Sequence, residues 1–434
     1  MRIVFPLPVR QIITKLRENG YEAYAVGGCV RDALLGREPE DWDITTSAKP
    51  QEVKRLFRRT IDTGIQHGTV TIMIGSDGYE VTTYRIDGAY EDGRHPKQVA
   101  FTSSLLEDLK RRDFTINAMA CGDETEVVDA FGGMEDLRRG VIRCVGDPLE
   151  RFGEDALRIL RAIRFSAQLD FSIEENTWNA IPVIAPNLAK VSRERVQIEL
   201  TKLLLSGHPE KIACVYETGI AAYVSKEFAA LPWREAVIPA SLPAEKYVRW
   251  AAFLRCTRYN MAAGVAAGRE DAETVDSQAA VMNDRDTSSY GDVLSQDAAE
   301  TAVRILRELK FDNDTIARVR TLVSWSGRKI PAQASAVRRA MSRMRLEVWD
   351  ALMELEKYPE EIHALSAQIR ADGDCLDLKH LALTGQDLIA AGVKPGREMG
   401  QLLGQLLDHV LERPQDNQKE ILMDVLKKLA SGND

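Results

Sequence analysis

The spacing of apolar positions changes along this chain. Residues 11–20 carry apolar side chains at helical spacing and end in a glycine, which predicts a helix. Residues 21–28 form an apolar run that ends in two glycines, as expected for a strand that enters a tight turn. Residues 30–36 predict a second, shorter helix. The first 140 residues therefore combine helices with strands.

Further along, the strand pattern gives way to a helical one. Residues 69–85 contain two alternating apolar runs joined by Ser76-Asp77-Gly78, which predicts a β-hairpin with its turn at those three residues. From about residue 154, apolar residues recur every three or four positions, as in residues 155–169 and 193–205. We therefore predict an α+β fold, with a small mixed-sheet head followed by an elongated all-helical neck, body and tail.

A chain of 434 residues is long enough for several domains. We expect a mixed helix-and-strand head at 1–140, a helical neck at 141–205, a helical body at 206–330 and a helical tail at 331–434. Small and acidic residues over 258–298 predict a mobile insert in the body. In the tail, Thr384 is expected to cap one helix and Pro395-Gly396 to open another.

Composition narrows the class of protein. Apolar residues make up 44% and charged residues 28%, which is ordinary for a folded globular protein. The six cysteines form no CxxC pair, so neither a zinc cluster nor a secreted disulfide framework is expected. We find no export signal and no apolar run long enough to span a membrane, and we expect a cytoplasmic protein.

A net charge of −9 would ordinarily argue against a nucleic-acid partner. The charge is unevenly distributed, however, because acidic residues gather in 270–300 while basic residues gather in 110–112, 151–164 and 338–345. Local potential matters more than the sum. The arginines of 338–345 are candidates for phosphate contacts, with a solvated basic helix as the alternative.

The strongest candidate for chemistry is the pair Asp41 and Asp43. On a strand, a spacing of two puts both carboxylates on one face, where they can share divalent cations for phosphoryl transfer. An isolated pair of this kind is more often a solvated turn. Here Gly28 stands at the start of a helix just upstream, where backbone N–H groups can hold phosphate oxygens, and Arg31 adds a cation. Glu80 is either a third acidic group or an exposed strand residue.

A second candidate lies on the predicted helix after residue 153. Asp155, Arg158, Arg161 and Arg164 recur at every third position and would line one face. A carboxylate accepts from the amino group of cytosine or adenine and a guanidinium donates to ring acceptors, so such a pair can read a base edge. The alternative is a solvated charged face.

Several segments together carry a family resemblance. Residues 27–36 (GGCVRDALLG), 41–46 (DWDITT), 109–120 (LKRRDFTINAMA), 128–148, 151–165 and 193–199 resemble the polymerase-β nucleotidyltransferase superfamily in its tRNA CCA-adding and bacterial poly(A) polymerase branch. The resemblance covers roughly the first two hundred residues. It implies an enzyme that adds CCA to the 3′ end of tRNA from CTP and ATP by two-metal transfer on Mg2+ held by Asp41 and Asp43.

The resemblance also assigns roles to single residues. Glu154, Asp155 and Arg158 match the EDxxR motif that reads the base, and Arg112, Arg161 and Arg164 would contact the nucleotide or its phosphates. Arg112 precedes residues 114–120, which we interpret as a helix, and Asp113 would cap it or orient a neighbouring arginine.

Other functions remain as alternatives. A poly(A) polymerase and an enzyme that adds only the final A carry the same head motifs. A Gly-rich loop between Arg85 and Leu109 favours addition of the terminal adenosine, because family members restricted to cytidine lack much of it. A catalytically silent RNA-binding protein is disfavoured by the intact aspartate pair, and a transferase acting on a small hydroxyl compound would not need the long helical part. No histidine is followed directly by an aspartate, so no appended phosphohydrolase is expected. No membrane partner is expected, and no protein partner is evident from the sequence.

Overall fold

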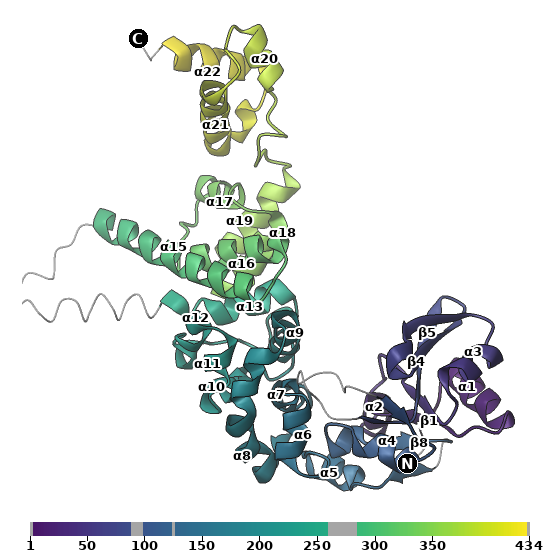
Figure 1. The fold of residues 1–434 in the computed structure, drawn as a ribbon. Helices are drawn as coiled ribbons and strands as arrows, with labels where there is room; N and C mark the ends of the chain where they lie inside the picture. The colour runs from purple at the N-terminus through teal and green to yellow at the C-terminus, as the bar shows by residue number, and fades with distance from the viewer. Residues whose placement is uncertain (1–2, 88–98, 124–125, 259–283, 432–434) are drawn as a thin grey trace, which may run out of the picture. The chain divides into compact units, whose positions relative to one another are not determined.

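The computed structural model describes residues 3–87, 99–123, 126–258 and 284–431 (Figure 1). The chain divides into two compact units, one formed by residues 1–240 with 304–311 and the other by residues 241–303 with 312–434. Strands and helices occur together in the first unit, and the described part of the second is helical. The predicted α+β class is confirmed.

A mixed sheet forms the head. Its seven strands stand in the order β3-β4-β5-β2-β1-β8-β9, with β2 and β5 parallel and the other neighbours antiparallel. The strands are β1 (Ala23–Val26), β2 (Ile44–Thr46), β3 (Thr60–Gly64), β4 (Thr69–Ile74), β5 (Asp77–Thr83), β8 (Met119–Cys121) and β9 (Val127–Asp129). β6 (Arg85–Asp87) and β7 (Val99–Phe101) form a separate hairpin. Residues 88–98 of the predicted loop lie outside the described residues.

The predicted hairpin is present, but its turn comes earlier than expected. Ile74 pairs with Asp77, so the loop is Gly75-Ser76 and not Ser76-Asp77-Gly78. Gly75 has a φ of 65°, which two-residue hairpin loops require and side chains disfavour. Gly78 instead lies in β5, where an added Cβ would come within 2.9 Å of the Thr71 methyl group.

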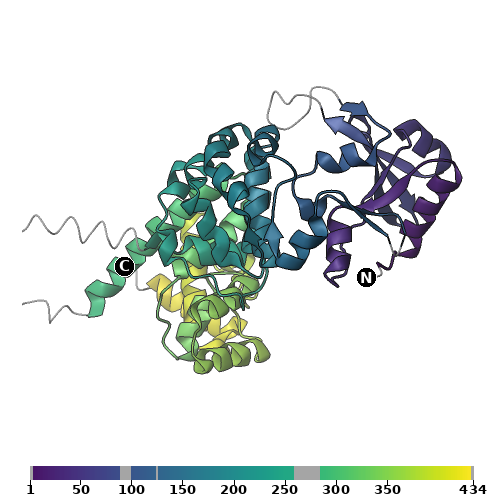
Figure 2. The ribbon, with the colours of Figure 1, turned by 90° about the horizontal axis from the view of Figure 1, so that it is seen from below.

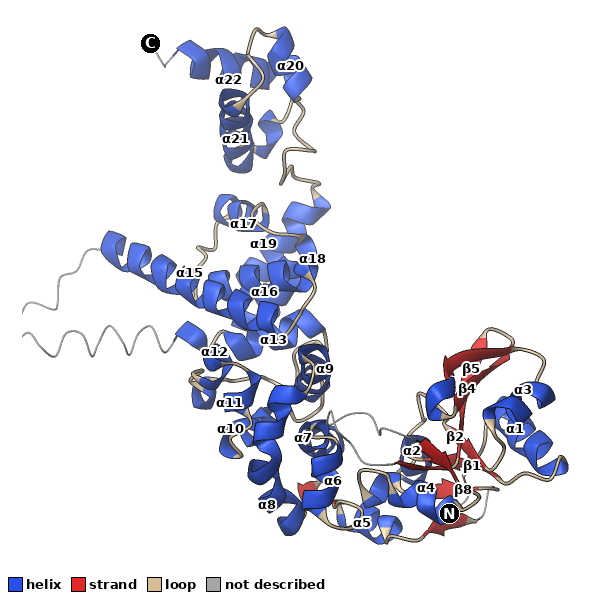
Figure 3. Cartoon of the chain, in the orientation of Figure 1, coloured by secondary structure: helices blue, strands red, loops and turns tan. Residues whose placement is uncertain are grey.

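Helices cover the sheet. They are α1 (Leu7–Glu18), α2 (Gly28–Leu34), α3 (Pro50–Leu56), α4 (Leu105–Lys110) and α5 (Gly133–Arg139), with short 3-10 turns η1 (Ile65–His67) and η2 (Thr115–Asn117). Helix α1 buries Val9, Ile12 and Leu16, which share one face at helical spacing. Figure 3 shows α1 and α3 beside one another next to the strands, and the two helices are in contact.

Residues 114–120 do not form the predicted helix. They form the 3-10 turn η2 and then strand β8, which pairs with β1 and β9 inside the sheet. Met119, Ala120 and Cys121 are completely buried. Because a strand buried on both faces is continuously apolar, the spacing of its residues does not distinguish it from a helix.

The remainder of the first unit is mainly helical. In Figure 2 most strands have the purple and blue colours of the N-terminal part of the chain. Its elements are α6 (Pro148–Glu154), α7 (Leu157–Leu169), α8 (Glu175–Ile184), η3 (Ala185–Lys190), α9 (Arg193–Leu204), η4 (Pro209–Ile212), α10 (Ala213–Glu217), α11 (Ala221–Val224), α12 (Lys226–Ala229) and η5 (Trp233–Glu235). Strands β10 (Val141–Ile142) and β11 (Ser172–Ile173) form a small parallel pair, which the helical pattern did not predict. Helix α7 packs on α9.

The second unit is built from α13 (Lys246–Leu254), α15 (Asp284–Glu308), α16 (Asn313–Trp325), α17 (Ala334–Met341), α18 (Leu346–Glu356), α19 (Glu360–Ala371), α20 (Gly385–Ala390), α21 (Arg397–Glu412), η6 (Pro414–Asp416) and α22 (Lys419–Ser431), with the end of α15 belonging to the first unit. Residues 284–298 of the predicted mobile insert are helical and belong to α15. Residues 259–283 of that insert lie outside the described residues. Within the described ranges, no helix is both long and apolar enough to cross a membrane.

Two expectations for the C-terminal helices can be compared directly. Thr384 caps α20 in a reciprocal capping box with Asp387, and Gly396 precedes α21, so both predicted helix starts are confirmed. The basic residues of 338–345 are less available than expected, because three are paired with acids. These pairs are Arg338 with Asp374, Arg339 with Glu412 and Arg345 with Asp314.

Candidate active site

The aspartate pair stands just before strand β2. Asp41 and Asp43 lie in the segment that leads into Ile44, not on the strand itself as the sequence suggested. The carbonyl of Asp43 accepts a hydrogen bond of 3.0 Å from the Val26 amide, which ties this segment to β1. The parallel register of β2 and β5 pairs Ile44 with Val81, so Asp43 comes next to Glu80. The charges of Asp43 and Asp41 therefore act on Glu80, although in the described part of the chain no three acidic, histidine or cysteine side chains lie close enough together to hold a metal ion.

Electrostatics at these carboxylates favour a bound cation. The Asp43 side chain reaches solvent, but the protein around it restricts its hydration and thereby raises its pKa; Asp41 adds to this effect and the positive charge of Arg112 opposes it. The pKa of Glu80 is raised by the same restricted hydration and by the charges of Asp43 and Asp41. Carboxylates that repel one another in this way fit a hard divalent cation, which takes oxygen ligands.

Trp42, the residue between the two aspartates, packs against an aromatic side chain. The Trp42 ring meets the Phe5 ring edge to face, with centroids 5.5 Å apart and an interplanar angle of 74°. Phe5 is buried in the segment that leads into α1. The aspartate segment is therefore fixed by β1 on one side and by an aromatic contact on the other.

The glycine turn admits an arginine. Gly27 has a φ of 84°, and an added Cβ would come within 2.9 Å of Nη1 of Arg112. Only a residue without a side chain suits both constraints. Arg112 is held 3.5 Å from the buried carboxylate of Asp108, and its Nε is buried without a hydrogen-bond partner among the described residues. An unpartnered buried donor is costly, so it suits a site that receives a ligand acceptor.

Helix α2 begins at Gly28, two residues earlier than predicted, with no side-chain cap at its N-terminus. Arg31 lies on this helix and is 8% exposed. It donates to both carboxylate oxygens of Asp32, at 2.9 and 2.8 Å, and to Oδ1 of Asn117 at 2.7 Å. The guanidinium of Arg31 is thus fixed in place beside the turn.

Asp155 is not on the helix that carries the arginines. It ends α6 in an extended conformation with φ −141° and ψ 102°, and α7 begins two residues later at Leu157. Its Oδ1 accepts from the Leu157 amide at 3.1 Å, and Arg195 on α9 donates to Oδ2 at 2.7 Å. The predicted single stripe is therefore wrong at its first member, because a short break separates Asp155 from α7.

Arg158 lies on α7 and connects neck to head. Its guanidinium donates to Glu154 at 2.5 Å, to the Arg151 carbonyl at 2.8 Å and to the Arg111 carbonyl at 3.1 Å. Arg111 belongs to the same segment as Arg112, so this contact places the neck arginine next to the head arginines. Two members of the predicted motif, Glu154 and Arg158, are thus direct partners.

The next two arginines of α7 are paired with buried acids. Arg161 donates to Asp113 at 2.8 and 2.6 Å through Nε and Nη2. Arg164 donates to Glu199 at 2.5 Å, and both side chains of that pair are less than a tenth exposed. Burial alone would raise the pKa of Asp113, but the charges of Arg161 and Arg158 more than offset this and lower it. Asp113 therefore orients an arginine, one of the two roles expected of it.

One aromatic ring gathers three of the arginines. The guanidinium carbons of Arg31, Arg161 and Arg164 lie 5.0, 5.3 and 3.8 Å from the Phe165 ring centroid. Cations prefer the faces of such a ring. Phe165 thus links α2 of the head to α7 of the neck.

Some residues of this cluster had no assigned role in the sequence. Phe165 sits inside the arginine pattern as an apolar residue, and Asp108 precedes the basic run 110–112. Arg195 and Glu199 lie on α9, four residues apart, and each holds one member of the predicted set. Their spacing on one helix face was the available signal, but a partner 35 to 40 residues away cannot be identified from spacing alone.

Family models match most of the chain in three parts. Residues 23–143 match a poly A polymerase head domain, residues 170–231 match an RNA- and SrmB-binding site of polymerase A, and residues 293–426 match tRNA nucleotidyltransferase domain 2.

Relatives and solved structures agree with these matches. A CCA-adding enzyme of Ligilactobacillus salivarius is 35% identical over 96% of this chain and 95% of its own. One of Leuconostoc mesenteroides is 56% identical over 46% of this chain, an alignment that spans about half of that relative. The CCA-adding enzyme of Bacillus stearothermophilus in complex with CTP has a TM-score of 0.73 and 31% identity, covering 99% of this chain and 100% of that one. With the aspartate pair, the glycine turn and the neck arginines in place, this chain belongs to the family of CCA-adding enzymes.

Proposed function

We propose that this protein adds C, C and A in turn to the 3′ end of tRNA, using CTP and ATP and releasing pyrophosphate. The observation that carries this proposal is a chain of neighbours within one compact unit: the charge of Arg112 acts on Asp43, and Arg158 at the start of α7 donates to the carbonyl of Arg111, the residue next to Arg112. If the neck took no part in recognising the nucleotide base, a hydrogen bond from Arg158 of the neck to the head would not be needed for catalysis. The tRNA-bound enzyme of Thermotoga maritima, 23% identical with a TM-score of 0.58, shares the fold.

A nucleotidyltransferase of this family uses divalent metal ions. We propose Mg2+, held by Asp41 and Asp43, whose crowded carboxylates fit a hard cation that binds one or two carboxylates plus substrate phosphates. When bound, the metal lowers the pKa of the attacking 3′-hydroxyl and neutralises charge on the triphosphate. Asp43 is the better-fixed ligand, since its backbone is hydrogen-bonded to β1.

The chain's own residues then position the reactants. In the transfer, a bond forms from the tRNA 3′-oxygen to the α-phosphorus, and the bond to the leaving pyrophosphate breaks. The start of α2 at Gly28 and the guanidiniums of Arg31 and Arg112 supply donors for the phosphates. Arg112 fits this role best, because its buried Nε lacks a partner in the described part of the protein.

The base would be read at the junction between α6 and α7. Asp155 accepts from the amino group that cytosine and adenine share, and Arg158 donates to a ring acceptor. Arg161 and Arg164 contact the nucleotide from the next turns of α7. All four have protein partners, so reading the base would exchange one set of partners for another.

The division of labour along the chain is part of the same proposal. The head at 1–140 catalyses, the neck at 141–205 reads the base, and the body at 206–330 leads to a tail at 331–434 that binds tRNA. Paired surface arginines such as Arg339, with a salt bridge half exposed to water, can exchange an acid for a phosphate at little cost. Action on tRNA would take place in the cytoplasm.

The test uses three tRNA acceptors that lack all three terminal nucleotides, the last two, or only the last one. Each is incubated with CTP, ATP or both, and the products are separated at single-nucleotide resolution. Ordered incorporation of both nucleotides with arrest after one A supports the proposal. Continued adenylation would indicate a poly(A) polymerase, the function named by the model that matches the head, and activity on the last acceptor alone would indicate an A-only enzyme.

A further inference from the structure

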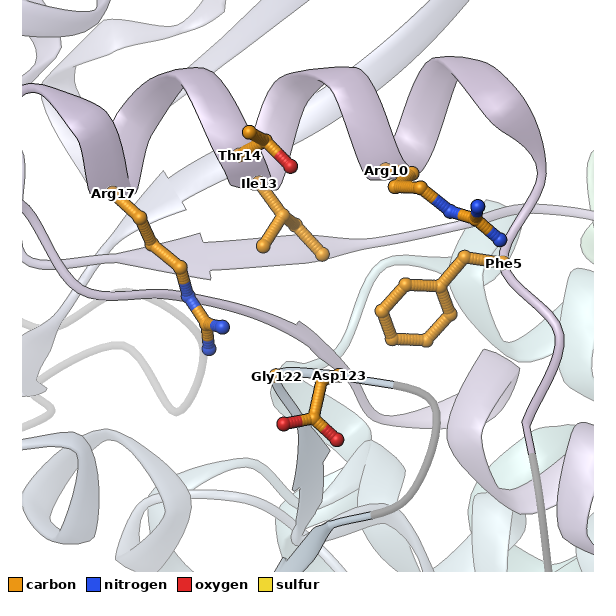
Figure 4. Close-up of a pocket in the computed structure, with 7 residues that line it drawn as sticks. All are labelled: Phe5, Arg10, Ile13, Thr14, Arg17, Gly122 and Asp123. Atoms are coloured by element: carbon orange, nitrogen blue, oxygen red, sulfur yellow. The ribbon is translucent and has the colours of Figure 1, made fainter.

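A groove in the head shares one residue with the surroundings of the site described above, because Phe5 both lines the groove and packs against Trp42. It runs between helix α1 and the residues that follow strand β8, and it encloses a volume of about 420 Å³ (Figure 4). That volume is within the range of small-molecule pockets. The groove is lined by Phe5, Arg10, Ile13, Thr14, Arg17, Gly122 and Asp123. None of these residues belongs to the proposed catalytic or nucleotide-binding set.

Arg17 is fixed at one end of the groove. Its Nε donates to the Ala23 carbonyl at 3.2 Å, and its guanidinium lies over the Tyr24 ring at 5.2 Å. Its Nη2 would come within 2.0 Å of a Cβ added at Gly122. The glycine therefore leaves room that the guanidinium fills. These three restraints hold the cation in one position before any ligand binds.

The same guanidinium has donors left over. Among the described residues, Arg17 forms no ion pair, and its hydrogen bond to the Ala23 carbonyl uses Nε alone. Its terminal nitrogens can therefore form the two parallel hydrogen bonds with which arginine binds phosphate. Because the side chain is already ordered, binding would lose little side-chain entropy.

The other walls of the groove are of mixed character. Arg10 is seven residues before Arg17 on α1, two turns or about 10 Å along the helix axis. Between them lie the buried Ile13 and the hydroxyl of Thr14, and Phe5 lies at the Arg10 end, as Figure 4 shows. The groove thus offers a cation at one end and an aromatic ring with a second cation at the other.

We propose that this groove binds a small aromatic compound that carries a phosphate group, with the phosphate on Arg17 and the ring against Ile13 and Phe5. A nucleoside monophosphate has this chemistry. The carboxylate of Asp123 on the opposite wall disfavours a continuous RNA backbone, which would place further phosphates beside it. The volume also suits one compact ligand.

The test measures binding of phenyl phosphate by calorimetry to the full-length protein saturated with CTP, so that the nucleotide site is occupied. We expect one equivalent to bind, with inorganic phosphate roughly tenfold weaker or more, because it lacks the ring. Arg17→Gln should weaken phenyl phosphate roughly tenfold or more. Arg55→Gln, which removes an exposed arginine from α3 of the same head, should change affinity less than about twofold.

A second variant tests the geometry without removing charge. Gly122→Ala places a methyl group where Nη2 of Arg17 lies and should weaken phenyl phosphate as Arg17→Gln does. Both variants should keep CCA addition at the wild-type rate. Equal binding of phenyl phosphate to the wild type and Arg17→Gln, or of phosphate and phenyl phosphate to the wild type, would overturn the proposal. Displacement of phenyl phosphate by a short RNA in an Arg17-dependent way would instead make the groove an RNA contact.

Discussion

Replacing Asp155 by alanine separates base reading from structural support. Asp155→Ala removes the proposed acceptor for the amino group of cytosine and adenine while leaving the aspartate pair and Arg112 untouched. A good base contact contributes about 1 to 3 kcal/mol, so the preference for CTP and ATP over UTP should fall roughly 5- to 150-fold.

Asp155→Ala should also lower the stability of the fold. Asp155 accepts from the Leu157 amide at the start of α7 and pairs with Arg195, with side chains only 16% and 21% exposed. Losing this hydrogen bond and this largely buried ion pair costs about 1 to 2 kcal/mol. For a unit of this size that lowers Tm by roughly 2 to 8 °C.

A matched control makes the selectivity result decisive. Asp147 caps the neighbouring helix α6 by accepting from the Glu150 amide at 3.0 Å, and it is exposed. Asp147→Ala should lower Tm by a similar amount and leave selectivity unchanged. The assay is kcat/KM for all four nucleotides on one tRNA acceptor, well below either melting temperature. If Asp155→Ala melts lower but keeps the wild-type preference, Asp155 is a structural residue and the base is read elsewhere.

Three further predictions concern charge. Asp41→Ala or Asp43→Ala should abolish addition of both nucleotides and leave tRNA affinity within a few fold, measured by product analysis and filter binding; substantial turnover in Mg2+ would contradict the metal assignment. The pKa values of Asp43 and Glu80 are raised in the folded protein, so these two groups contribute stability at low pH that is lost as the pH rises through their pKa values. Mg2+ should therefore raise Tm more at pH 8 than at pH 4.5. If Mg2+ raised the Tm of Asp43→Asn as much as that of the wild type, this prediction would be refuted. Glu199→Ala leaves the buried Arg164 without its carboxylate and should cost about 3 to 5 kcal/mol in denaturant unfolding, where a loss below 1 kcal/mol would show that the pair is not needed.

Sequence patterns located the chemistry well where it depends on neighbours in the chain. The helix that follows the glycine turn and the cap at Thr384 are local features, and the structure has Thr384 as a cap and the helix start within two residues of its predicted position. Local hydrogen bonds decide such features. Even here the aspartates lie before the strand, because β2 is only three residues long.

The errors occurred where distant contacts decide the conformation. Strand β8 exists because β1 and β9 pair with it, and residues 284–298 are helical although their composition is that of a linker. Asp155 leaves the helical conformation where its carboxylate meets Arg195 of α9. Tertiary partners override local propensity at β8 and at Asp155. The partners Arg195 and Glu199 could not be matched to their targets from spacing alone.

The paired state of the neck arginines bears on how the proposed enzyme would choose its nucleotide. Because Asp155 and Arg158 already have protein partners, a correct base replaces one set of hydrogen bonds by another, and the net gain is small. A uracil presents a carbonyl where cytosine presents an amino group, so it would displace Arg195 from Asp155 without giving the carboxylate a donor. Rejection of the wrong base would then come mainly from the free-energy cost of leaving the Asp155 carboxylate unpaired. This cost would remain as long as the junction between α6 and α7 keeps the carboxylate from turning to solvent.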